Sequence, residues 1–205
     1  MCNLYRLKSV QGEVAAMFRE VAPELTVSAP GNAPDEIYPG YPGLVFADGA
    51  LRQMVWGFPL ALKGAKGQPL KPKPVNNARA DKLSSPFWAA SFRARRCLIP
   101  VSAFAEAEGV KGAKTRSWFT LPDAPLMAMA GFWRDSAEWG AAYTMVMTEA
   151  NPLVQPVHER MPVILPPASW AQWLAGDPQD ALALCRPYAG AMQIERTATL
   201  WSGRR

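Results

Sequence analysis

Proline sets the first limit on what this chain can fold into. Twenty of its 205 residues are proline, about twice the usual proportion, and they are spread along the whole sequence. Because proline lacks a backbone N–H and has a fixed φ, it interrupts helices and the interiors of sheets. The sequence therefore favours short strands joined by rigid turns.

Hydrophobic periodicity predicts only short helices. The expected helices span residues 10–21, 84–94, 168–175 and 178–185. Pro23 follows the first of them, and Asp177 is a suitable N-cap for the last, with Pro178 at its first position.

Alternating and continuous apolar runs predict many strands. Leu44–Ala47 and Leu51–Phe58 are expected to form a hairpin around Asp48-Gly49, a dipeptide typical of tight turns. The other predicted strands are Arg96–Val101, Ser117–Leu121, Leu126–Phe132, Ala142–Thr148 and Gln193–Thr199. Residues 22–43 are expected to be irregular, and residues 60–74, rich in Lys, Gly and Pro, to be a mobile loop.

These elements show no regular alternation of strand and helix, so a doubly wound parallel sheet is not expected. The predicted fold class is α+β: a single domain over residues 1–205 with a mainly antiparallel, barrel-like sheet and a few peripheral helices. Closing the sheet is a natural way to protect so many strand edges. Apolar residues make up 49% of the chain and charged residues 19%, as in a globular protein.

Several classes of protein are not expected. The chain has no run of 18 apolar residues and no apolar signal-peptide region at its start, so we expect a cytoplasmic protein without a membrane span, and a monomer. Three cysteines without C-x-x-C spacing predict neither a disulfide framework nor a zinc site. We expect no metal and no cofactor.

The chain is basic, with a formal net charge of +5, which permits a polyanionic partner without requiring one. Three clusters of positive charge stand out: Lys63, Lys66, Lys71 and Lys73; Arg93, Arg95 and Arg96; and Lys111, Lys114 and Arg116. Each is also compatible with a merely solvated surface.

Cys2 directly follows the first methionine. Removal of Met1 would leave an α-amine and a thiol on one residue. Such an amine has a pKa of about 8, well below that of lysine, and the thiol is strongly nucleophilic. This 1,2-aminothiol can condense with an aldehyde through nitrogen and then close a five-membered ring through sulfur. A frayed terminal cysteine without a role is the alternative.

Three polar residues occur where chemistry is possible. Glu106 ends an apolar run, so burial would raise its pKa towards neutrality and make it a usable acid or base. His158 is the only histidine and is followed by Arg160. Asn77 precedes Arg79, a side chain suited to phosphate or carboxylate. Each has a structural alternative: a strand-end carboxylate, a packed histidine, or a turn asparagine.

The aromatic loop Trp56-Gly57-Phe58-Pro59 lies next to the lysine-rich residues 60–74. Trp56 and Phe58 are therefore candidates for stacking on unpaired bases, although core packing is the commoner use of such rings.

Five ordered blocks of the sequence resemble the SOS response-associated peptidase (SRAP) family. They are Met1-Cys2, Trp56-Gly57-Phe58-Pro59, Asn77-Ala78-Arg79, Arg96–Pro100 with Phe104 and Glu106, and His158-Glu159-Arg160-Met161-Pro162. The resemblance implies a barrel-like α+β domain with a positively charged cleft for single-stranded DNA. It also implies a covalent thiazolidine link to abasic sites in DNA damage and self-removal of the residue before Cys2.

The resemblance also implies roles for individual residues. Cys2 would be the nucleophile, Asn77 would hold its amine or the sugar, Glu106 would shuttle protons, and His158 would favour the open aldehyde. Arg79 and Arg160 would contact phosphates.

The chain departs from the family pattern at several positions. Asn3 and Leu4 replace the usual Gly-Arg, Asp81 replaces a glutamate, and alanines flank Glu106, which predicts a wetter pocket. Two other functions stay open: a cysteine hydrolase with a Cys2–His158 dyad, and a non-catalytic module that binds single-stranded DNA.

Overall fold

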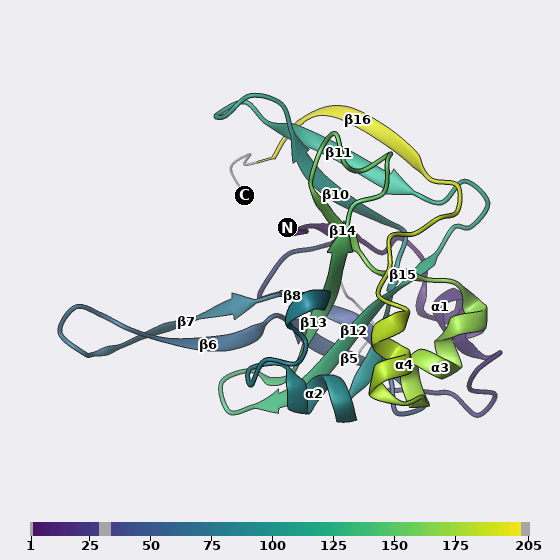
Figure 1. The fold of residues 1–205 in the computed structure, drawn as a ribbon, viewed down its shortest axis with the longest axis horizontal. Helices are drawn as coiled ribbons and strands as arrows, with labels where there is room; N and C mark the ends of the chain where they lie inside the picture. The colour runs from purple at the N-terminus through teal and green to yellow at the C-terminus, as the bar shows by residue number, and fades with distance from the viewer. Residues whose placement is uncertain (1, 29–33, 202–205) are drawn as a thin grey trace.

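Five strands close into a barrel in the computed structural model, which describes residues 2–28 and 34–201 (Figure 1). In the order of their pairing they are β13 (Gly140–Glu149), β12 (Met127–Ser136), β9 (Arg96–Val101), β4 (Pro42–Ala47) and β5 (Ala50–Trp56). Neighbours in this order are antiparallel, and parallel pairing of β5 with β13 closes the ring. The fold class predicted from the sequence is confirmed.

Short strands extend the barrel at its rim: β2 (Thr26–Val27), β8 (Asn77–Arg79), β14 (Arg160–Pro162) and β15 (Ile164–Leu165). Both β8 and β14 pair with the end of β13, opposite Met147 through Arg79 and Pro162 respectively. This arrangement brings two segments that are far apart in the sequence to one strand end.

A second, antiparallel sheet lies beside the barrel (Figure 1). Its order is β16 (Gln193–Leu200), β11 (Thr115–Thr120), β10 (Ala103–Glu108), β1 (Tyr5–Arg6) and β3 (Glu36–Ile37). The start of the chain thus lies inside a sheet, between β10 and β3, and is not frayed from Cys2 onwards. The short strands β2 and β3 fall in the stretch predicted to be irregular.

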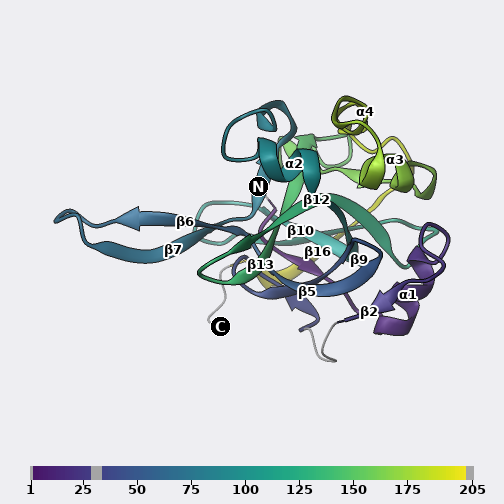
Figure 2. The same cartoon turned by 90° about the horizontal axis from the view of Figure 1, so that it is seen from below.

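The helices are peripheral and shorter than predicted: α1 (Gln11–Phe18), α2 (Ala89–Ala94), α3 (Trp170–Ala175) and α4 (Pro178–Ala183), with 3-10 turns at Ala80–Lys82 and Pro167–Ser169. In Figure 2, α2, α3 and α4 lie above the barrel and α1 lies at its right-hand end, where Phe18 packs against Trp170 of α3. The Asp177 carboxylate accepts a hydrogen bond from the Gln179 backbone N–H at 2.8 Å, which confirms the predicted cap. Within the described residues no helix is long and apolar enough to cross a membrane.

The tight turn between β4 and β5 confirms the hairpin expected around Asp48-Gly49. Asp48 and Gly49 have φ values of 50° and 72°, which match the turn type whose twist suits a two-residue hairpin.

The lysine-rich stretch predicted as a mobile loop is instead a long β-hairpin, formed by β6 (Phe58–Lys63) and β7 (Pro69–Val75). It forms a two-stranded sheet of its own and projects away from the barrel (Figures 1 and 2). The prediction was wrong because proline was read as a loop former. In a two-stranded ribbon every strand is an edge, and an edge tolerates proline.

Candidate functional site

The second sheet holds the start of the chain in a fixed place. Tyr5 pairs with Phe104 of β10, and the Ala105 backbone N–H donates to the Leu4 carbonyl oxygen at 3.0 Å. Cys2 lies two residues further towards the terminus and has 0% exposure. Its thiol donates to the Leu4 carbonyl oxygen at 3.6 Å.

Cys2 is held by two neighbouring asparagines, Asn77 in β8 and Asn76 immediately before that strand. The Asn77 side-chain amide donates to the Cys2 carbonyl oxygen at 2.7 Å, and the Asn76 amide donates to the same oxygen at 3.0 Å. Asn76 also donates to the Asn3 side-chain oxygen at 3.1 Å. The Asn77 side-chain oxygen is buried and has no hydrogen-bond partner among the described residues, which leaves an acceptor available beside Cys2.

Buried aromatic side chains support the two asparagines that bind the Cys2 carbonyl oxygen. The Trp56 indole N–H donates to the Asn76 carbonyl oxygen at 3.1 Å, and the Trp56 ring meets the Tyr5 ring edge-on with centroids 5.0 Å apart. The Tyr5 hydroxyl is hydrogen-bonded to that of Tyr143. A Cβ at Gly43 would collide with both hydroxyls, so only glycine fits against this pair.

Glu106 is deeply buried, with 3% exposure, so the wetter pocket predicted from its alanine neighbours is wrong. The cause is its place in β10, opposite the buried Ser117 of β11. Burial raises the pKa of Glu106 to about 7, against smaller lowering effects of the positive amino terminus and of Lys114. One carboxyl oxygen, Oε1, has no hydrogen-bond partner among the described residues.

The charge of Glu106 affects the pKa of the Cys2 thiol. Burial raises the pKa of the Cys2 thiol, and the negative charge of Glu106 raises it further. Cys2 is therefore a protonated thiol at neutral pH, next to a carboxyl group poised to exchange a proton there.

His158 precedes β14 and is half-buried. Its Nδ1 accepts the Arg160 backbone N–H at 3.0 Å, which fixes the ring beside that strand. Burial lowers the pKa of His158, and the positive amino terminus lowers it further. The same positive charge acts on Glu106, so both groups lie within electrostatic reach of the start of the chain.

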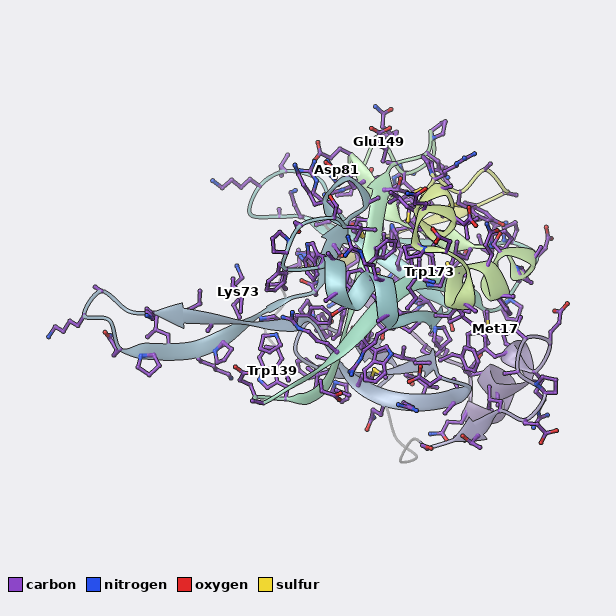
Figure 3. The ribbon with its side chains drawn as sticks, turned by 60° about the horizontal axis from the view of Figure 1, so that its bottom comes forward. Met17, Lys73, Asp81, Trp139, Glu149 and Trp173 are labelled. Atoms are coloured by element: carbon purple, nitrogen blue, oxygen red, sulfur yellow. The ribbon has the colours of Figure 1, made fainter. Side chains whose placement is uncertain are left out.

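Arg79 and Arg160 line one pocket of about 360 Å³ at the end of β13, together with Arg186. Arg79 forms a two-point ion pair with Asp81, at 2.9 and 2.6 Å. Both side chains of that pair are exposed, and exposed ion pairs are weak enough to exchange for a phosphate. Figure 3 shows Asp81 and Glu149, another lining residue, on the same side of the molecule.

Trp56 and Phe58 are not available for base stacking, because both are fully buried in the core. Gly57, between them, has a φ of 116°, which favours glycine, and a Cβ there would collide with Pro74. Phe58 packs against Trp88 and Phe132. The candidate DNA-binding role of these two rings is corrected to a structural one.

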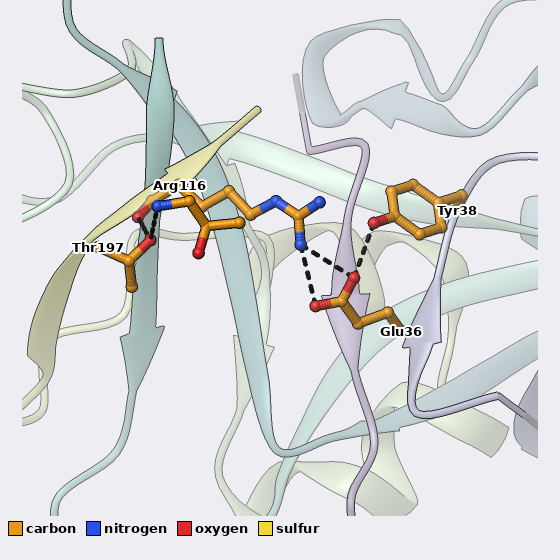
Figure 4. A network of polar contacts seen from close by, with 5 residues as sticks. Glu36, Tyr38, Arg116 and Thr197 are labelled. Atoms are coloured by element: carbon orange, nitrogen blue, oxygen red, sulfur yellow. Dashed lines mark hydrogen bonds and ion pairs between the residues drawn. The ribbon is translucent and has the colours of Figure 1, made fainter. Parts of the chain in front are cut away.

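Two of the three basic clusters contain arginines with structural partners. Arg96 is buried and donates to the Phe92 carbonyl oxygen at 3.0 Å, and Arg95 pairs with Asp135 at 2.7 Å. Arg116 donates to both carboxyl oxygens of Glu36 at 3.0 Å (Figure 4). Arg93 and the exposed lysines of the three clusters remain as the predicted cationic surface.

Leu4 replaces the family's arginine in the interior, not on the surface. It has 1% exposure and packs with Ala103, Ala105 and Trp118. Position 4 therefore contributes no phosphate contact here, and any such contact has to come from elsewhere.

Comparison with known proteins identifies the family of this chain. A family model described as SOS response associated peptidase (SRAP) matches residues 1–200. The chain belongs to the SRAP family. It is 31% identical over 160 residues to the abasic site processing protein YoqW of Bacillus subtilis, which covers 73% of this chain and 70% of that protein. It is 33% identical over 106 residues to the abasic site processing protein YMR114C of Saccharomyces cerevisiae, covering 49% and 28%.

Solved structures share the SRAP chain's fold. A crystal structure of a protein from Bordetella bronchiseptica has a TM-score of 0.76 and 23% identity, covering 96% of this chain and 99% of that one. A second, from Bacteroides thetaiotaomicron, has a TM-score of 0.74 and 17% identity, covering 95% and 91%. At these identities the likeness establishes the fold alone.

Sequence reasoning missed two residues of this candidate site. Asn76 was passed over in favour of Asn77, although the Asn76-Asn77 pair itself was a visible signal. Arg186 follows a helix far along the chain, and only the three-dimensional fold brings it to Arg79 and Arg160.

Proposed function

We propose that this protein processes abasic sites in single-stranded DNA by forming a covalent thiazolidine between Cys2 and the ring-opened abasic sugar. The observation that carries the proposal is the setting of Cys2. The residue is buried and clamped through its carbonyl oxygen, and the unpartnered oxygens of Asn77 and Glu106 lie near it. Relatives named abasic site processing proteins support the choice of substrate.

The reaction uses both groups of Cys2. The α-amine, free once Met1 is removed, adds to the aldehyde carbon and loses one water to give an imine. The thiol sulfur then adds to the imine carbon, and a proton ends on the nitrogen as the five-membered ring closes. The net change is the loss of one water, and no oxidant is consumed.

The neighbouring side chains supply positioning and proton transfer. The free Asn77 oxygen would accept a hydrogen bond from the Cys2 amine, while its amide group keeps the Cys2 carbonyl in place. Glu106, with a pKa of about 7, is suited to donate the proton that releases water and to accept the thiol proton. His158, neutral because its pKa is lowered, would act on the sugar oxygen to favour the open aldehyde.

Single-stranded DNA would reach Cys2 across the Arg79–Arg160 pocket. Arg79 would release Asp81 and take up a phosphate, since guanidinium groups bind phosphate in the same two-point manner as carboxylate. Arg160 lines the same pocket and would contact a neighbouring phosphate.

Met1 has to be removed before this chemistry begins, because a peptide nitrogen does not form an imine. We propose that the protein cleaves the Met1–Cys2 peptide bond itself, which agrees with the peptidase in the family's description. A hydrolase of other peptides based on Cys2 and His158 is less well supported. Burial raises the pKa of the thiol, whereas a thiolate nucleophile requires the opposite shift.

The test is a denaturing gel. Met1-free protein is incubated with a single-stranded oligonucleotide carrying one abasic site, and the expected result is a shifted, covalent band. Cys2→Ala is expected to give none, whereas Cys97→Ala, the same change at a buried cysteine of β9, is expected to give the same band as wild type. An oligonucleotide whose abasic aldehyde has been reduced to an alcohol is expected to give no band. A band with Cys2→Ala or with the reduced DNA contradicts the proposal.

A further inference from the structure

Glu106 has a side-chain neighbour that the chemistry above does not use. Glu106 of β10 lies directly opposite Ser117 of β11. Side chains at opposite positions of an antiparallel pair lie on the same face of the sheet, with Cβ atoms about 5 Å apart. Ser117 is buried, with 1% exposure. Its hydroxyl therefore lies in the same buried region as the carboxyl group of Glu106.

The proton of the Ser117 hydroxyl is directed away from Glu106. Ser117 donates it to Oε2 of Glu108, which lies two residues further along β10 on the same face. Both carboxyl oxygens of Glu108 also accept the Nε–H of Arg196, in β16, at 3.0 Å. The hydrogen bond from Ser117 and then that from Arg196 lower the pKa of Glu108. Glu108 is therefore a carboxylate at neutral pH and only accepts hydrogen bonds.

This arrangement limits what Ser117 can offer to Glu106. A hydroxyl has one proton and two acceptor lone pairs, and Glu108 takes the proton. The lone pairs that remain accept a hydrogen bond from a protonated carboxyl group, but they repel a carboxylate. Oε1 of Glu106 is buried and has no hydrogen-bond partner among the described residues. The charged form of Glu106 is therefore left without a donor at this oxygen.

The other titratable groups around Glu106 come from several elements. The positive amino terminus and Lys114, just before β11, lower the pKa of Glu106 against the larger effect of burial. The Cys2 thiol and the Tyr5 hydroxyl of β1 are neutral because burial raises the pKa of each. His158, before β14, is neutral because burial lowers its pKa. The orientation of the Ser117 hydroxyl is thus a separate influence on the charge of Glu106.

We propose that Glu108 keeps Glu106 in its protonated form by holding the Ser117 hydroxyl proton away from it, and so sets the pH range in which the protein crosslinks DNA. Glu108 and Ser117 are positioning residues, because they act through Glu106. The inference rests on the proposed function, in which protonated Glu106 donates the proton that releases water.

The test compares Glu108→Ala with Glu195→Ala. Glu108→Ala frees the Ser117 hydroxyl to donate to Glu106, which stabilises the carboxylate. Glu195→Ala is the matched control, because it removes the same charge from β16 at a position paired with Trp118, on the other face of the sheet. One readout is the pKa of Glu106 in the DNA-free protein, from carboxyl carbon NMR, with the signal assigned by its absence in Glu106→Gln. The other is the pH dependence of the single-turnover crosslinking rate.

In Glu108→Ala the pKa of Glu106 is expected to fall from about 7 to about 6, as expected for one hydrogen bond to a charged group. Crosslinking by the Met1-free protein requires the protonated form. It is therefore expected to be about tenfold slower than wild type at pH 8 and within about twofold of wild type at pH 5. Glu195→Ala is expected to match wild type at both pH values.

The combined variant Glu108→Ala/Ser117→Ala shows whether the effect passes through the hydroxyl. Without a hydroxyl to turn, the removal of Glu108 is expected to leave the pKa of Glu106 as it is in Ser117→Ala. The full fall in this background would mean that Glu108 acts by its charge alone.

The inference is overturned by that result, by an unchanged pKa of Glu106 in Glu108→Ala, or by an equal fall in Glu195→Ala. A fall in pKa that leaves the pH dependence of crosslinking unchanged overturns it as well. Proteins that show the predicted fall in pKa but form no crosslink contradict the proposed function, and they leave the control of Glu106 by Glu108 and Ser117 supported.

Discussion

Two clusters of polar side chains in the same sheet illustrate different uses of a carboxylate. In the first, Glu36 accepts two hydrogen bonds from Arg116 at 3.0 Å and one from the Tyr38 hydroxyl at 2.7 Å (Figure 4). In the second, Glu106 is buried with one oxygen unpartnered among the described residues. The first carboxylate is satisfied by the fold, whereas the second is left in an environment that disfavours its charge.

This difference distinguishes a carboxylate with a structural role, Glu36, from one with a functional role, Glu106. A buried acceptor without a partner costs about 1–3 kcal/mol, so the fold would be more stable if Glu106 were replaced by a neutral residue. Such a cost is typical of a site that has to bind something else. The five predictions below test that contrast and the site around Glu106, from the largest expected effect to the smallest.

Glu106→Gln is expected to slow crosslinking about 100-fold, a usual contribution of general acid–base catalysis. The side chain keeps its shape but no longer transfers a proton. Single-turnover rates with single-stranded abasic DNA at pH 7 measure the effect. A rate within threefold of wild type contradicts the role assigned to Glu106.

The same variant tests the electrostatic cost of the site. The pKa of Glu106 is raised from 4.5 to about 7 in the folded protein, so folding favours its neutral form. Wild-type stability is therefore expected to fall as pH rises from about 4.5 to 7, by up to about 3 kcal/mol, and Glu106→Gln is expected to lack that fall. Urea unfolding at pH 5 and pH 8 measures the difference. An equal pH dependence in both proteins contradicts it.

Asn77→Ala is expected to slow crosslinking about tenfold, because one hydrogen bond to Cys2 is worth about 1 kcal/mol and the free acceptor is lost with it. Asn76→Ala is the matched variant, since its amide donates to the same oxygen at a longer 3.0 Å. Its effect is expected to be smaller. The reverse order is inconsistent with the placement of the Cys2 amine beside Asn77.

Asp81→Asn is expected to tighten binding of single-stranded DNA about two- to fivefold, because it releases Arg79 from an exposed ion pair that competes with phosphate for the guanidinium group. Asp135→Asn serves as the control, since it releases Arg95 away from the pocket. Fluorescence anisotropy with undamaged DNA measures both. Equal increases in DNA affinity for the two variants would indicate that the change in net charge alone causes the effect.

Glu36→Gln is expected to leave the crosslinking rate unchanged and to lower stability by roughly 1 kcal/mol, because Arg116 loses its charged partner. The pair of measurements, single-turnover rate and urea unfolding, is the same as for Glu106→Gln. We therefore expect opposite outcomes for the two glutamates: Glu106→Gln changes the crosslinking rate, whereas Glu36→Gln changes only the stability.

Much of the fold followed from the sequence because its signals are local. The Asp48-Gly49 turn and the Asp177 cap each depend on residues a few positions apart. The β6–β7 hairpin was not predicted because proline and lysine suit both a loop and a strand edge, and local propensity does not separate the two.

The site was harder to predict in its details. The positions of Cys2 and Glu106 in ordered motifs indicated the chemistry, yet neither the burial of Glu106 nor that of Trp56 follows from local sequence. Burial depends on which strands become neighbours, and these pairings join segments far apart in the sequence. The Arg79–Arg160–Arg186 pocket likewise exists only once β8 and β14 meet β13.

The most direct test of the central claim, that the amine and thiol of Cys2 together capture the abasic aldehyde, is intact mass spectrometry of the covalent complex. The mass is expected to equal that of the Met1-free protein plus the DNA, less one water. The adduct is expected on the peptide that begins at Cys2, with its sulfur resistant to alkylation. An adduct on a lysine, a complex that retains Met1, or a freely alkylated Cys2 sulfur would contradict the account.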